Sequence, residues 1–341
     1  MRTLEQLVRR NIATMSPYST ARDEYQGDIG IYLDANENPY DNGVNRYPDP
    51  RQRALKRRIS EIKGLPAENI FIGNGSDEAI DLVFRVFCDP RRDNVIAITP
   101  SYGMYGVAAA MNDVEIREVP LGENFALSSD ALLKVADQNT KAIFLCSPNN
   151  PTGNLLERGE IERILRDFDG IVVLDEAYID FARETGFITQ LPQYEKLILL
   201  QTMSKAWAMA GLRVGLALAD KRITDLFTRV KYPYNINVVT QKTVLDMLRH
   251  DVADQVNEVI EQRKLVVEAL TGAAVVKHIY PSDANFILVK MEEPKRIYNI
   301  LIDNGIIVRD RSRVAGCEGT LRITIGTPEQ NRKLIEIMHG L

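Results

Sequence analysis

The fold is decided by residues 141–178, which read KAIFLCSPNNPTGNLLERGEIERILRDFDGIVVLDEAY. Two apolar runs, at 141–146 and 170–174, are predicted to be strands because both are short and rich in strand-forming residues. The segment between them, 157–168, has apolar residues at helical spacing. Strand, helix and strand in this order predict a parallel strand pair covered by a helix, the repeating unit of α/β proteins.

The same alternation continues on both sides of this stretch. Further strands are predicted at 94–98, 114–119, 196–201 and 212–218, and further helices at 51–63 and 77–87. Several of the strands are apolar throughout, as strands buried on both faces of a sheet are. We therefore predict a large α/β domain at residues 30–235, in which a mostly parallel sheet lies between two layers of helices.

The pattern changes after residue 235. Long helices are predicted at 238–249 and 252–271, followed by short strands near 274–277, 285–290, 306–308 and 320–325 and by helices at 294–304 and 328–339. This mixture predicts a smaller α+β domain at residues 236–341. We assign residues 1–29 to the same small domain, although this segment could pack on either half.

The composition argues against several classes of protein. The chain has 341 residues, of which 45% are hydrophobic, and its net charge of −5 provides no basic surplus for a nucleic acid or an anionic membrane. No apolar run reaches the roughly 20 residues of a membrane span. The cysteines, Cys88, Cys146 and Cys317, are too scattered for a disulfide framework or a metal site. We expect a cytoplasmic protein that binds no metal, nucleic acid or membrane.

The segment LLQTMSKAWAMAGLRVG (199–215) holds the first candidates for chemistry. Lys205 follows a predicted strand among apolar and small residues, which a surface lysine would not need. A desolvated lysine has a lowered pKa, and its neutral amine can form a Schiff base with a carbonyl compound. The hydroxyls of Thr202 and Ser204 and the guanidinium of Arg213 offer the donors that a phosphate monoester needs. The segment therefore suggests a phosphorylated aldehyde cofactor.

Two further segments follow the strands of the opening stretch. Asp175 stands at the carboxyl end of a predicted strand, where ligands bind in open parallel sheets, so its carboxylate could pair with a protonated ring nitrogen. It could equally cap a helix that begins at the next residue. In SPNNPTG (147–153), the prolines restrict the backbone. That rigidity would let Asn150 hold its amide against a phenolate oxygen.

Two other segments support a cofactor site less specifically. In GNGSD (73–77), glycines precede a predicted helix, whose first backbone amides could bind a phosphate, although Ser or Asp at such a place is usually only a cap. Tyr102 and Tyr105 follow another strand, and core packing is the default interpretation of such a pair. Tyr102 is closer to the strand end and could lie flat against a planar ring.

In their order, SPNNPTG (147–153), LDEAY (174–178), TMSKAW (202–207) and RITIG (322–326) resemble the fold type I aminotransferases, which use pyridoxal 5′-phosphate. Within that group, YLDANENPY (32–40), NRYPDP (45–50) and GTLRITIGT (319–327) look specifically like the histidinol-phosphate aminotransferase family of histidine biosynthesis. The resemblance covers nearly the whole chain. It implies a mostly parallel sheet of seven-stranded type, an aminotransferase activity and a homodimer.

The resemblance also implies roles for individual residues. Lys205, Asp175 and Tyr178 match catalytic residues: the lysine binds the cofactor and moves a proton, the aspartate pairs with the ring nitrogen, and the tyrosine contacts the ring oxygen. The other cofactor-binding positions are Gly75, Ser76, Asp77, Tyr102, Asn150, Thr202, Ser204, Arg213 and, from the neighbouring subunit, Tyr47. Substrate-binding positions are Tyr18, Asn36, Arg309 and Arg322, with Arg322 expected at the α-carboxylate of glutamate and Arg309 at the phosphate of histidinol phosphate.

The implied reaction converts L-histidinol phosphate and 2-oxoglutarate to imidazole acetol phosphate and L-glutamate. Two alternatives on the same scaffold stay open: an aromatic amino-acid aminotransferase with a looser side-chain pocket, and a threonine-phosphate decarboxylase, which would release carbon dioxide. A third alternative is a nucleotide-binding or regulatory module without catalysis. GNGSD (73–77) does not match the dinucleotide-binding fingerprint, which argues against this third alternative.

Overall fold

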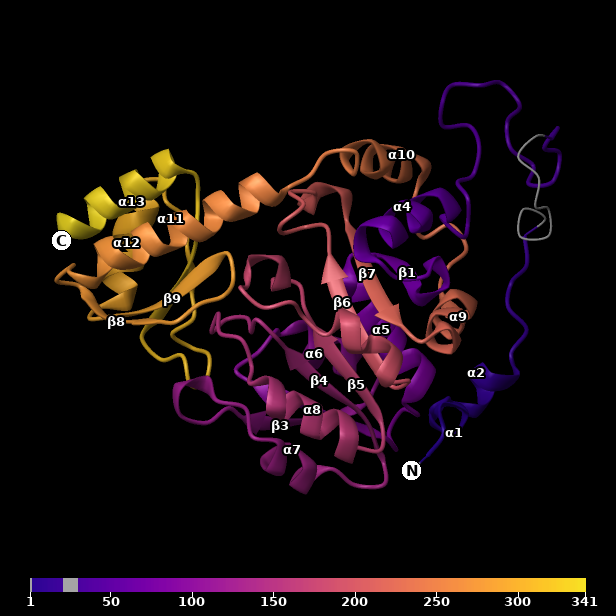
Figure 1. Cartoon of the computed structure of the whole chain (residues 1–341), viewed down its shortest axis with the longest axis horizontal. Helices are drawn as coiled ribbons and strands as arrows, with labels where there is room; N and C mark the ends of the chain where they lie inside the picture. Colours follow the sequence, from indigo (N-terminus) through magenta and orange to yellow (C-terminus); the bar gives the residue numbers. More distant parts are fainter. Residues whose placement is uncertain (1, 21–29) are drawn as a thin grey trace.

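A seven-stranded sheet forms the centre of the larger domain in this computed structural model, which describes residues 2–20 and 30–341 (Figure 1). Its strands are β1 (Ile70–Asn74), β2 (Asn94–Thr99), β3 (Glu115–Pro120), β4 (Thr140–Cys146), β5 (Ile171–Asp175), β6 (Leu197–Thr202) and β7 (Val214–Ala219), in the spatial order β1-β7-β6-β5-β4-β2-β3. Among these strands, β7 runs opposite to the other six, and all pairs that do not include it are parallel. The predicted α/β fold with a mostly parallel sheet is therefore confirmed. Strand β1 was not predicted, because its apolar run is only three residues long before Gly73.

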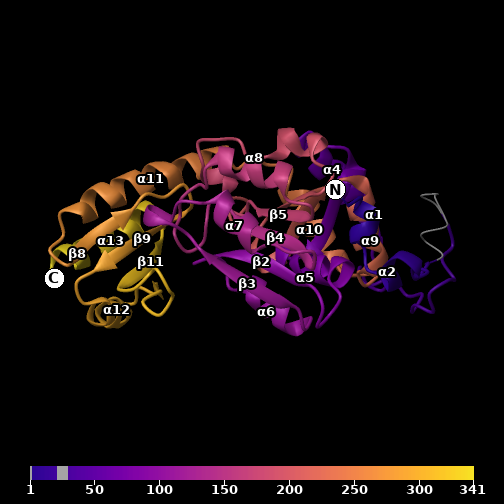
Figure 2. The ribbon, with the colours of Figure 1, turned by 90° about the horizontal axis from the view of Figure 1, so that it is seen from below.

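Helices cover both faces of this sheet, because successive side chains of each strand point to opposite sides. In β4, Ile143 and Leu145 pack with α4 (Arg53–Lys63), α7 (Ser129–Val135) and α8 (Arg158–Asp167). Ala142 and Phe144 pack on the other face with α5 (Ser76–Phe87), α6 (Met104–Met111) and α9 (Lys221–Val230). Figure 2 shows α8 on one side of the strands and α6 on the other. The strands in the middle are thus buried on both faces, as predicted.

The smaller domain contains a four-stranded antiparallel sheet. Its strands are β8 (Val276–Tyr280), β9 (Phe286–Met291), β10 (Arg309–Asp310) and β11 (Thr320–Thr324), in the order β10-β11-β9-β8. The helices α11 (Ala253–Thr271), α12 (Pro294–Asp303) and α13 (Pro328–His339) pack against it around a separate apolar core. The predicted α+β character is confirmed. The strand expected at 306–308 forms instead at Arg309–Asp310, where it pairs with β11.

The division between the domains lies later in the chain than residue 235. Helix α10 (Val238–Met247) contributes Val244 to the same apolar core as Leu55 of α4, so it belongs to the large domain. The next helix, α11, has Val256 in that core and Val266 in the core of the small domain. The expectation that the small domain starts at residue 236 is therefore wrong, because the first helix after residue 235 buries its apolar face on the large domain.

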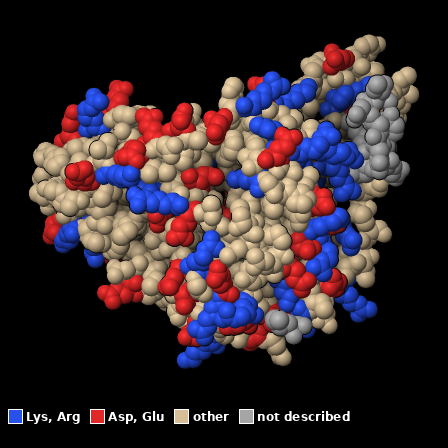
Figure 3. Space-filling model, viewed as in Figure 1, with Lys and Arg blue, Asp and Glu red and all other residues tan. Residues whose placement is uncertain are grey.

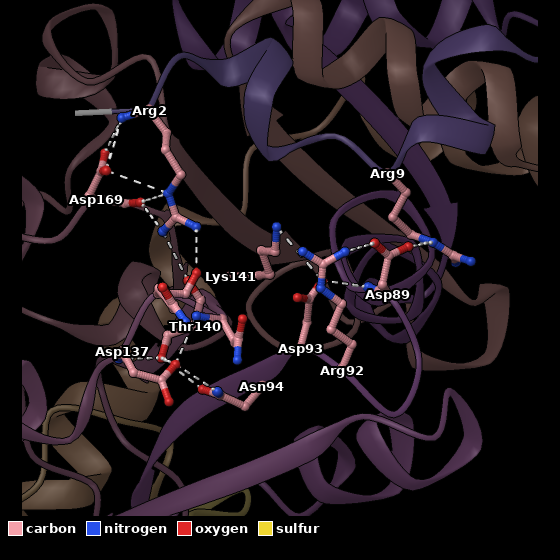
Figure 4. Close-up of polar contacts among 12 residues, drawn as sticks. Arg2, Arg9, Asp89, Arg92, Asp93, Asn94, Asp137, Thr140, Lys141 and Asp169 are labelled. Atoms are coloured by element: carbon pink, nitrogen blue, oxygen red, sulfur yellow. Dashed lines mark hydrogen bonds and ion pairs between the residues drawn. The ribbon is translucent and has the colours of Figure 1, made fainter.

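The N-terminal segment also packs on the large domain, through α1 (Leu4–Leu7) and α2 (Arg10–Thr14). The backbone amide of Arg2 donates to Asp169 Oδ1 over 2.7 Å, and Arg9 Nε lies 3.3 Å from Asp89 Oδ1 (Figure 4). Buried leucines of α1 join the core beside α5. For residues 2–14, the assignment of 1–29 to the small domain is thus wrong. Residues 1 and 21–29 of that range lie outside the described residues.

The described surface carries both signs of charge. On the face shown in Figure 3, lysine and arginine side chains lie among aspartate and glutamate side chains over both domains. None of the described helices is both long enough and apolar enough to cross a membrane.

Candidate active site

A cavity of about 400 Å³ opens where the carboxyl ends of the parallel strands face the small domain. It is lined by thirteen of the predicted site residues: Gly75, Ser76, Asp77, Tyr102, Asn150, Asp175, Tyr178, Thr202, Ser204, Lys205, Arg213, Arg309 and Arg322. Cys146, Ala177 and Arg311 complete the lining. The cavity thus combines a lysine, a buried aspartate, a helix N-terminus and four arginines.

Asp175 ends β5 at the floor of the cavity, where it is almost completely buried. Its Oδ2 accepts a hydrogen bond from the hydroxyl of Tyr105 over 2.9 Å, and its Oδ1 accepts one from the backbone amide of Ala177 over 3.1 Å. Burial raises the pKa of Asp175 to about 6, although both hydrogen bonds act in the opposite direction. One carboxylate thus holds a local turn and also lies in the cavity. The helix that it could have capped does not begin at the next residue, because the next element is the short 3₁₀ helix Ile179–Phe181.

Lys205 reaches into the cavity from the turn after β6. Its Nζ lies 5.4 Å from the centre of the Tyr178 ring. Desolvation lowers the pKa of Lys205, and the positive charges of Arg322 and Arg213 lower it further, while Asp175 opposes them. The side chain itself is exposed to the open cavity. The lysine is therefore accessible to a ligand and has a larger neutral fraction than an ordinary lysine.

A cradle for an anion forms where α5 begins. Gly75 precedes this 12-residue helix with φ 75°, a conformation that favours glycine, and the first backbone amides of the helix have no partner within it. The backbone of β7 approaches so closely that a Cβ on Gly215 would lie 2.0 Å from Ser76 N. Arg213 lies over the same turn, 3.4 Å from Asp77 Oδ2. Helix amides and a guanidinium thus converge on one point, as a phosphate group requires.

Two hydroxyl groups from the turn after β6 lie in the same cavity as this cradle. Thr202 and Ser204 both line the cavity, and Thr202 Oγ1 accepts a hydrogen bond from the amide of Ser204 over 3.1 Å. Tyr102 closes the adjacent side, and its hydroxyl donates to Asp77 Oδ1 over 3.0 Å. The side chain of Asp77 therefore orients both Tyr102 and Arg213.

Asn150 links the two domains across the cavity. Its Nδ2 donates to the hydroxyl oxygen of Tyr178 over 3.4 Å, and its Oδ1 accepts from Nη1 of Arg322 over 2.5 Å. Asn150 and Tyr178 come from the large domain, whereas Arg322 lies on β11. Burial raises the pKa of Tyr178, and the charge of Arg322 opposes that rise.

Three predicted residues lie outside this cavity. Tyr18 is 74% exposed and lines a separate cavity beside Pro50. Asn36 is exposed, with φ 55°. Tyr47 is 49% exposed, and its ring stacks on that of Tyr234 with centroids 4.4 Å apart. The roles that the resemblance implies for these three residues stay predictions. Tyr47 in particular was expected to act in a neighbouring subunit.

Sequence reasoning missed two residues that matter for the site. Tyr105 was interpreted as core packing, and its ring is buried, but its hydroxyl reaches Asp175. Arg311 lines the cavity beside Arg309 and Arg322. A signal for Arg311 was present, because it stands two residues after Arg309 and alternate residues of a strand share a face. The strand itself was predicted too early in the chain, at 306–308.

Comparison with known proteins gives this arrangement its context. Residues 32–338 match the family described as aminotransferase class I and II. The chain is 50% identical over 343 residues to histidinol-phosphate aminotransferase of Parabacteroides distasonis, which covers 100% of this chain and 99% of that protein.

Solved structures share the fold. The histidinol-phosphate aminotransferase of Clostridium acetobutylicum superposes with a TM-score of 0.80 at 24% identity, covering 87% of this chain and 90% of that one. That of Sinorhizobium meliloti in complex with pyridoxal-5′-phosphate gives a TM-score of 0.79 at 20% identity, covering 86% of this chain and 82% of that one. By its family match and its full-length relative, this chain belongs to the class I and II aminotransferases and, within them, to the histidinol-phosphate aminotransferase family.

Proposed function

We propose that this protein transfers an amino group between L-histidinol phosphate and 2-oxoglutarate, giving imidazole acetol phosphate and L-glutamate, with pyridoxal 5′-phosphate as cofactor. The observation that carries this proposal is the convergence of Lys205, Asp175 and the amide cradle at Ser76 in one cavity, opposite the arginines of the small domain. A metal is not part of the proposal. Among the described residues, no cluster of His, Cys, Asp and Glu could hold one.

The residues present fit this cofactor. The cradle at Gly75 and Ser76, with Arg213, suits its phosphate. Asp175 is a buried acid whose charged form would be stabilised by a cation, because burial raises its pKa to about 6 even against the two hydrogen bonds that it accepts. A protonated ring nitrogen is such a cation. When bound, the cofactor supplies a carbonyl carbon that accepts an amine and a ring that withdraws electrons.

Each residue then has a defined task. With the cofactor bound, Asp175 would keep the ring nitrogen protonated, and Tyr102 would pack against the ring. Tyr178 and Asn150 would contact the ring oxygen. Lys205 Nζ, with its lowered pKa, would hold the cofactor and would move the proton at Cα of the substrate.

The small domain provides the charges that select the substrates. Arg322, held by Asn150, suits the α-carboxylate of glutamate, and Arg309 suits the phosphate of histidinol phosphate. The two half-reactions present different anions to the same cavity, and guanidinium groups bind both.

We propose a homodimer as the active form. Residues 31–47 carry exposed apolar side chains, among them Ile31, Leu33 and Tyr40, which are 90%, 86% and 82% exposed in the single chain. A second copy would cover such a surface. Tyr47 lies in this segment and would then reach the cofactor phosphate of the neighbouring subunit.

The proposal is tested by single-turnover reactions of the cofactor-loaded enzyme with L-histidinol phosphate, phenylalanine, tyrosine and threonine phosphate. The change in cofactor absorbance gives each rate, and released carbon dioxide is measured in parallel. We expect conversion of histidinol phosphate at a rate at least tenfold above the others, roughly what one buried anion contact provides. Faster conversion of phenylalanine or tyrosine would indicate an aromatic amino-acid aminotransferase instead. Release of carbon dioxide from threonine phosphate would indicate a threonine-phosphate decarboxylase.

A further inference from the structure

Arg311 belongs to a row of three arginines on one face of the small sheet. In the antiparallel pairing of β10 with β11, Arg309 stands directly opposite Arg322. The backbone amide of Arg311 donates to the carbonyl oxygen of Thr320 over 3.0 Å, which continues the pairing by one more step. Alternate residues of a strand point to the same side, so Arg309 and Arg311 share a face with Arg322. All three line the cavity.

Within the described part of the chain, no carboxylate is among the charges that act on Arg311 or Arg322. Burial lowers the pKa of Arg311, and the charges of Arg322 and Arg309 lower it further. The groups that oppose this shift are the Cys317 thiol and the Tyr178 hydroxyl, and a carboxylate is not among them. Like charges opposite one another destabilise a sheet. The row therefore has a free-energy cost that a bound anion would offset.

Two guanidinium nitrogens in the row also lack hydrogen-bond partners. The Nε atoms of Arg311 and Arg322 are buried, and neither has a partner among the described residues. Nη1 of Arg322 already donates a hydrogen bond to Asn150, so the edge of the guanidinium group that carries Nε stays available for a ligand. A buried donor without a partner costs free energy. Hydrogen bonds from these two nitrogens to the oxygens of a ligand would remove this cost.

We propose that Arg311 is a specificity-determining residue that binds the phosphate group of the amino donor together with Arg309, and that the carboxylate substrate does not need it. This inference rests on the proposed function. A phosphate monoester has close to two negative charges and three acceptor oxygens, whereas an α-carboxylate has one charge and two oxygens. Arg322 alone matches the carboxylate in a bidentate pair. The tetrahedral dianion uses the additional donors and the additional positive charge of Arg309 and Arg311.

The test measures the two half-reactions of the cofactor-loaded enzyme separately. Arg311→Gln and Arg311→Lys are compared with wild type and with Arg313→Gln, a matched control because Arg313 is exposed and stands two residues further along the same segment. For Arg311→Gln we expect kcat/KM with histidinol phosphate to fall by about 10- to 100-fold, as the loss of a charged hydrogen bond predicts, and kcat/KM with glutamate to change by less than about threefold. Arg311→Lys should recover part of the loss, since it restores the charge without the planar donors.

A second readout does not depend on turnover of the phosphorylated substrate. Inorganic phosphate should inhibit the glutamate half-reaction of the wild type competitively, and Arg311→Gln should weaken this inhibition by about tenfold or more. Equal losses in both half-reactions, a larger loss with glutamate, or unchanged phosphate inhibition would overturn the assignment of Arg311. If wild type fails to convert histidinol phosphate, the proposed function fails, while the inhibition experiment still decides whether Arg311 binds phosphate.

Discussion

The hydroxyl of Tyr105 lies 2.9 Å from Oδ2 of Asp175, and both side chains are buried. The Tyr105 ring stacks on that of Phe144, with centroids 5.1 Å apart, and lies nearly at right angles to the Tyr102 ring, with centroids 5.7 Å apart. Since this hydroxyl donates to the carboxylate, it opposes the rise that burial causes in the pKa of Asp175. We therefore expect Tyr105 to be a positioning residue that acts through Asp175.

Tyr105→Phe removes this donor and keeps the ring. The pKa of Asp175 should rise, and a carboxyl group is protonated below its pKa, so the acid side of the pH–kcat profile should move to higher pH by about one unit. KM should change little because Tyr105 does not line the cavity. Tyr298→Phe, in the small domain, is the control. An unchanged pH profile would reduce Tyr105 to a packing residue.

Asp175→Asn keeps the shape of the side chain and removes its charge. Without a negative partner the ring nitrogen would lose its proton, so kcat should fall by roughly 10²- to 10⁴-fold, as the loss of a preorganised charge does elsewhere. Single-turnover rates with glutamate measure the effect. Nearly normal rates would leave Asp175 only a structural role, as the acceptor of hydrogen bonds from the Tyr105 hydroxyl and the Ala177 amide.

Lys205→Ala should still bind the cofactor through the cradle and Asp175 but should lose turnover by about a thousandfold or more, because no other amine moves the proton. In wild type, borohydride should attach the cofactor irreversibly to a peptide that contains Lys205, as mass spectrometry can detect. A label on a different lysine would contradict this role.

Glu176 allows a test of stability against pH. Burial raises its pKa to about 7, from an ordinary value of 4.5. Because the pKa of Glu176 is higher in the folded state than in the unfolded state, its contribution to the free energy of unfolding is full below pH 4.5. This contribution is lost as the pH rises through 7. Glu176→Gln does not titrate, so at pH 8 the variant should be more stable than wild type by up to about 3 kcal/mol.

The amide that Glu176→Gln introduces has a hydrogen-bond partner nearby, the side chain of Gln201. Gln201 Nε2 donates to Glu176 Oε2 over 3.0 Å, whereas Gln201 Oε1 is buried and has no partner within the described residues. A rotated Gln201 amide would offer this oxygen to the substituted side chain. Urea unfolding from pH 5 to 8, with the exposed Glu184→Gln as control, measures the difference. A difference that does not depend on pH would contradict the raised pKa.

Gly215→Ala should damage the phosphate cradle. The new Cβ would lie 2.0 Å from Ser76 N, so β7 and the start of α5 must move apart. We expect a loss of about 2–4 kcal/mol in the free energy of unfolding and weaker cofactor binding. At Gly211, a Cβ would meet nothing within 4 Å, so Gly211→Ala should behave like wild type in both measurements. Normal cofactor affinity in Gly215→Ala would show that the cradle does not depend on this close approach.

Site residues could be predicted from the sequence where the residue type is unusual for its local surroundings. Lys205 among small apolar residues and Asp175 at a strand end could be predicted, because both features are local. Tyr105 could not, since a tyrosine with a buried ring looks the same in sequence whether or not its hydroxyl meets a carboxylate. The N-terminal helices were misplaced for a related reason: an amphipathic segment shows that a face is buried but not which domain buries it.

Helix α11 has one end in each hydrophobic core, with Val256 in the first and Val266 in the second. This 19-residue helix is about 28 Å long, and its far end packs in the core of the small domain. A slight tilt near Val256 displaces the far end much more than the pivot. Such a tilt would change the distance between Lys205 and Arg322, although neither residue lies on α11.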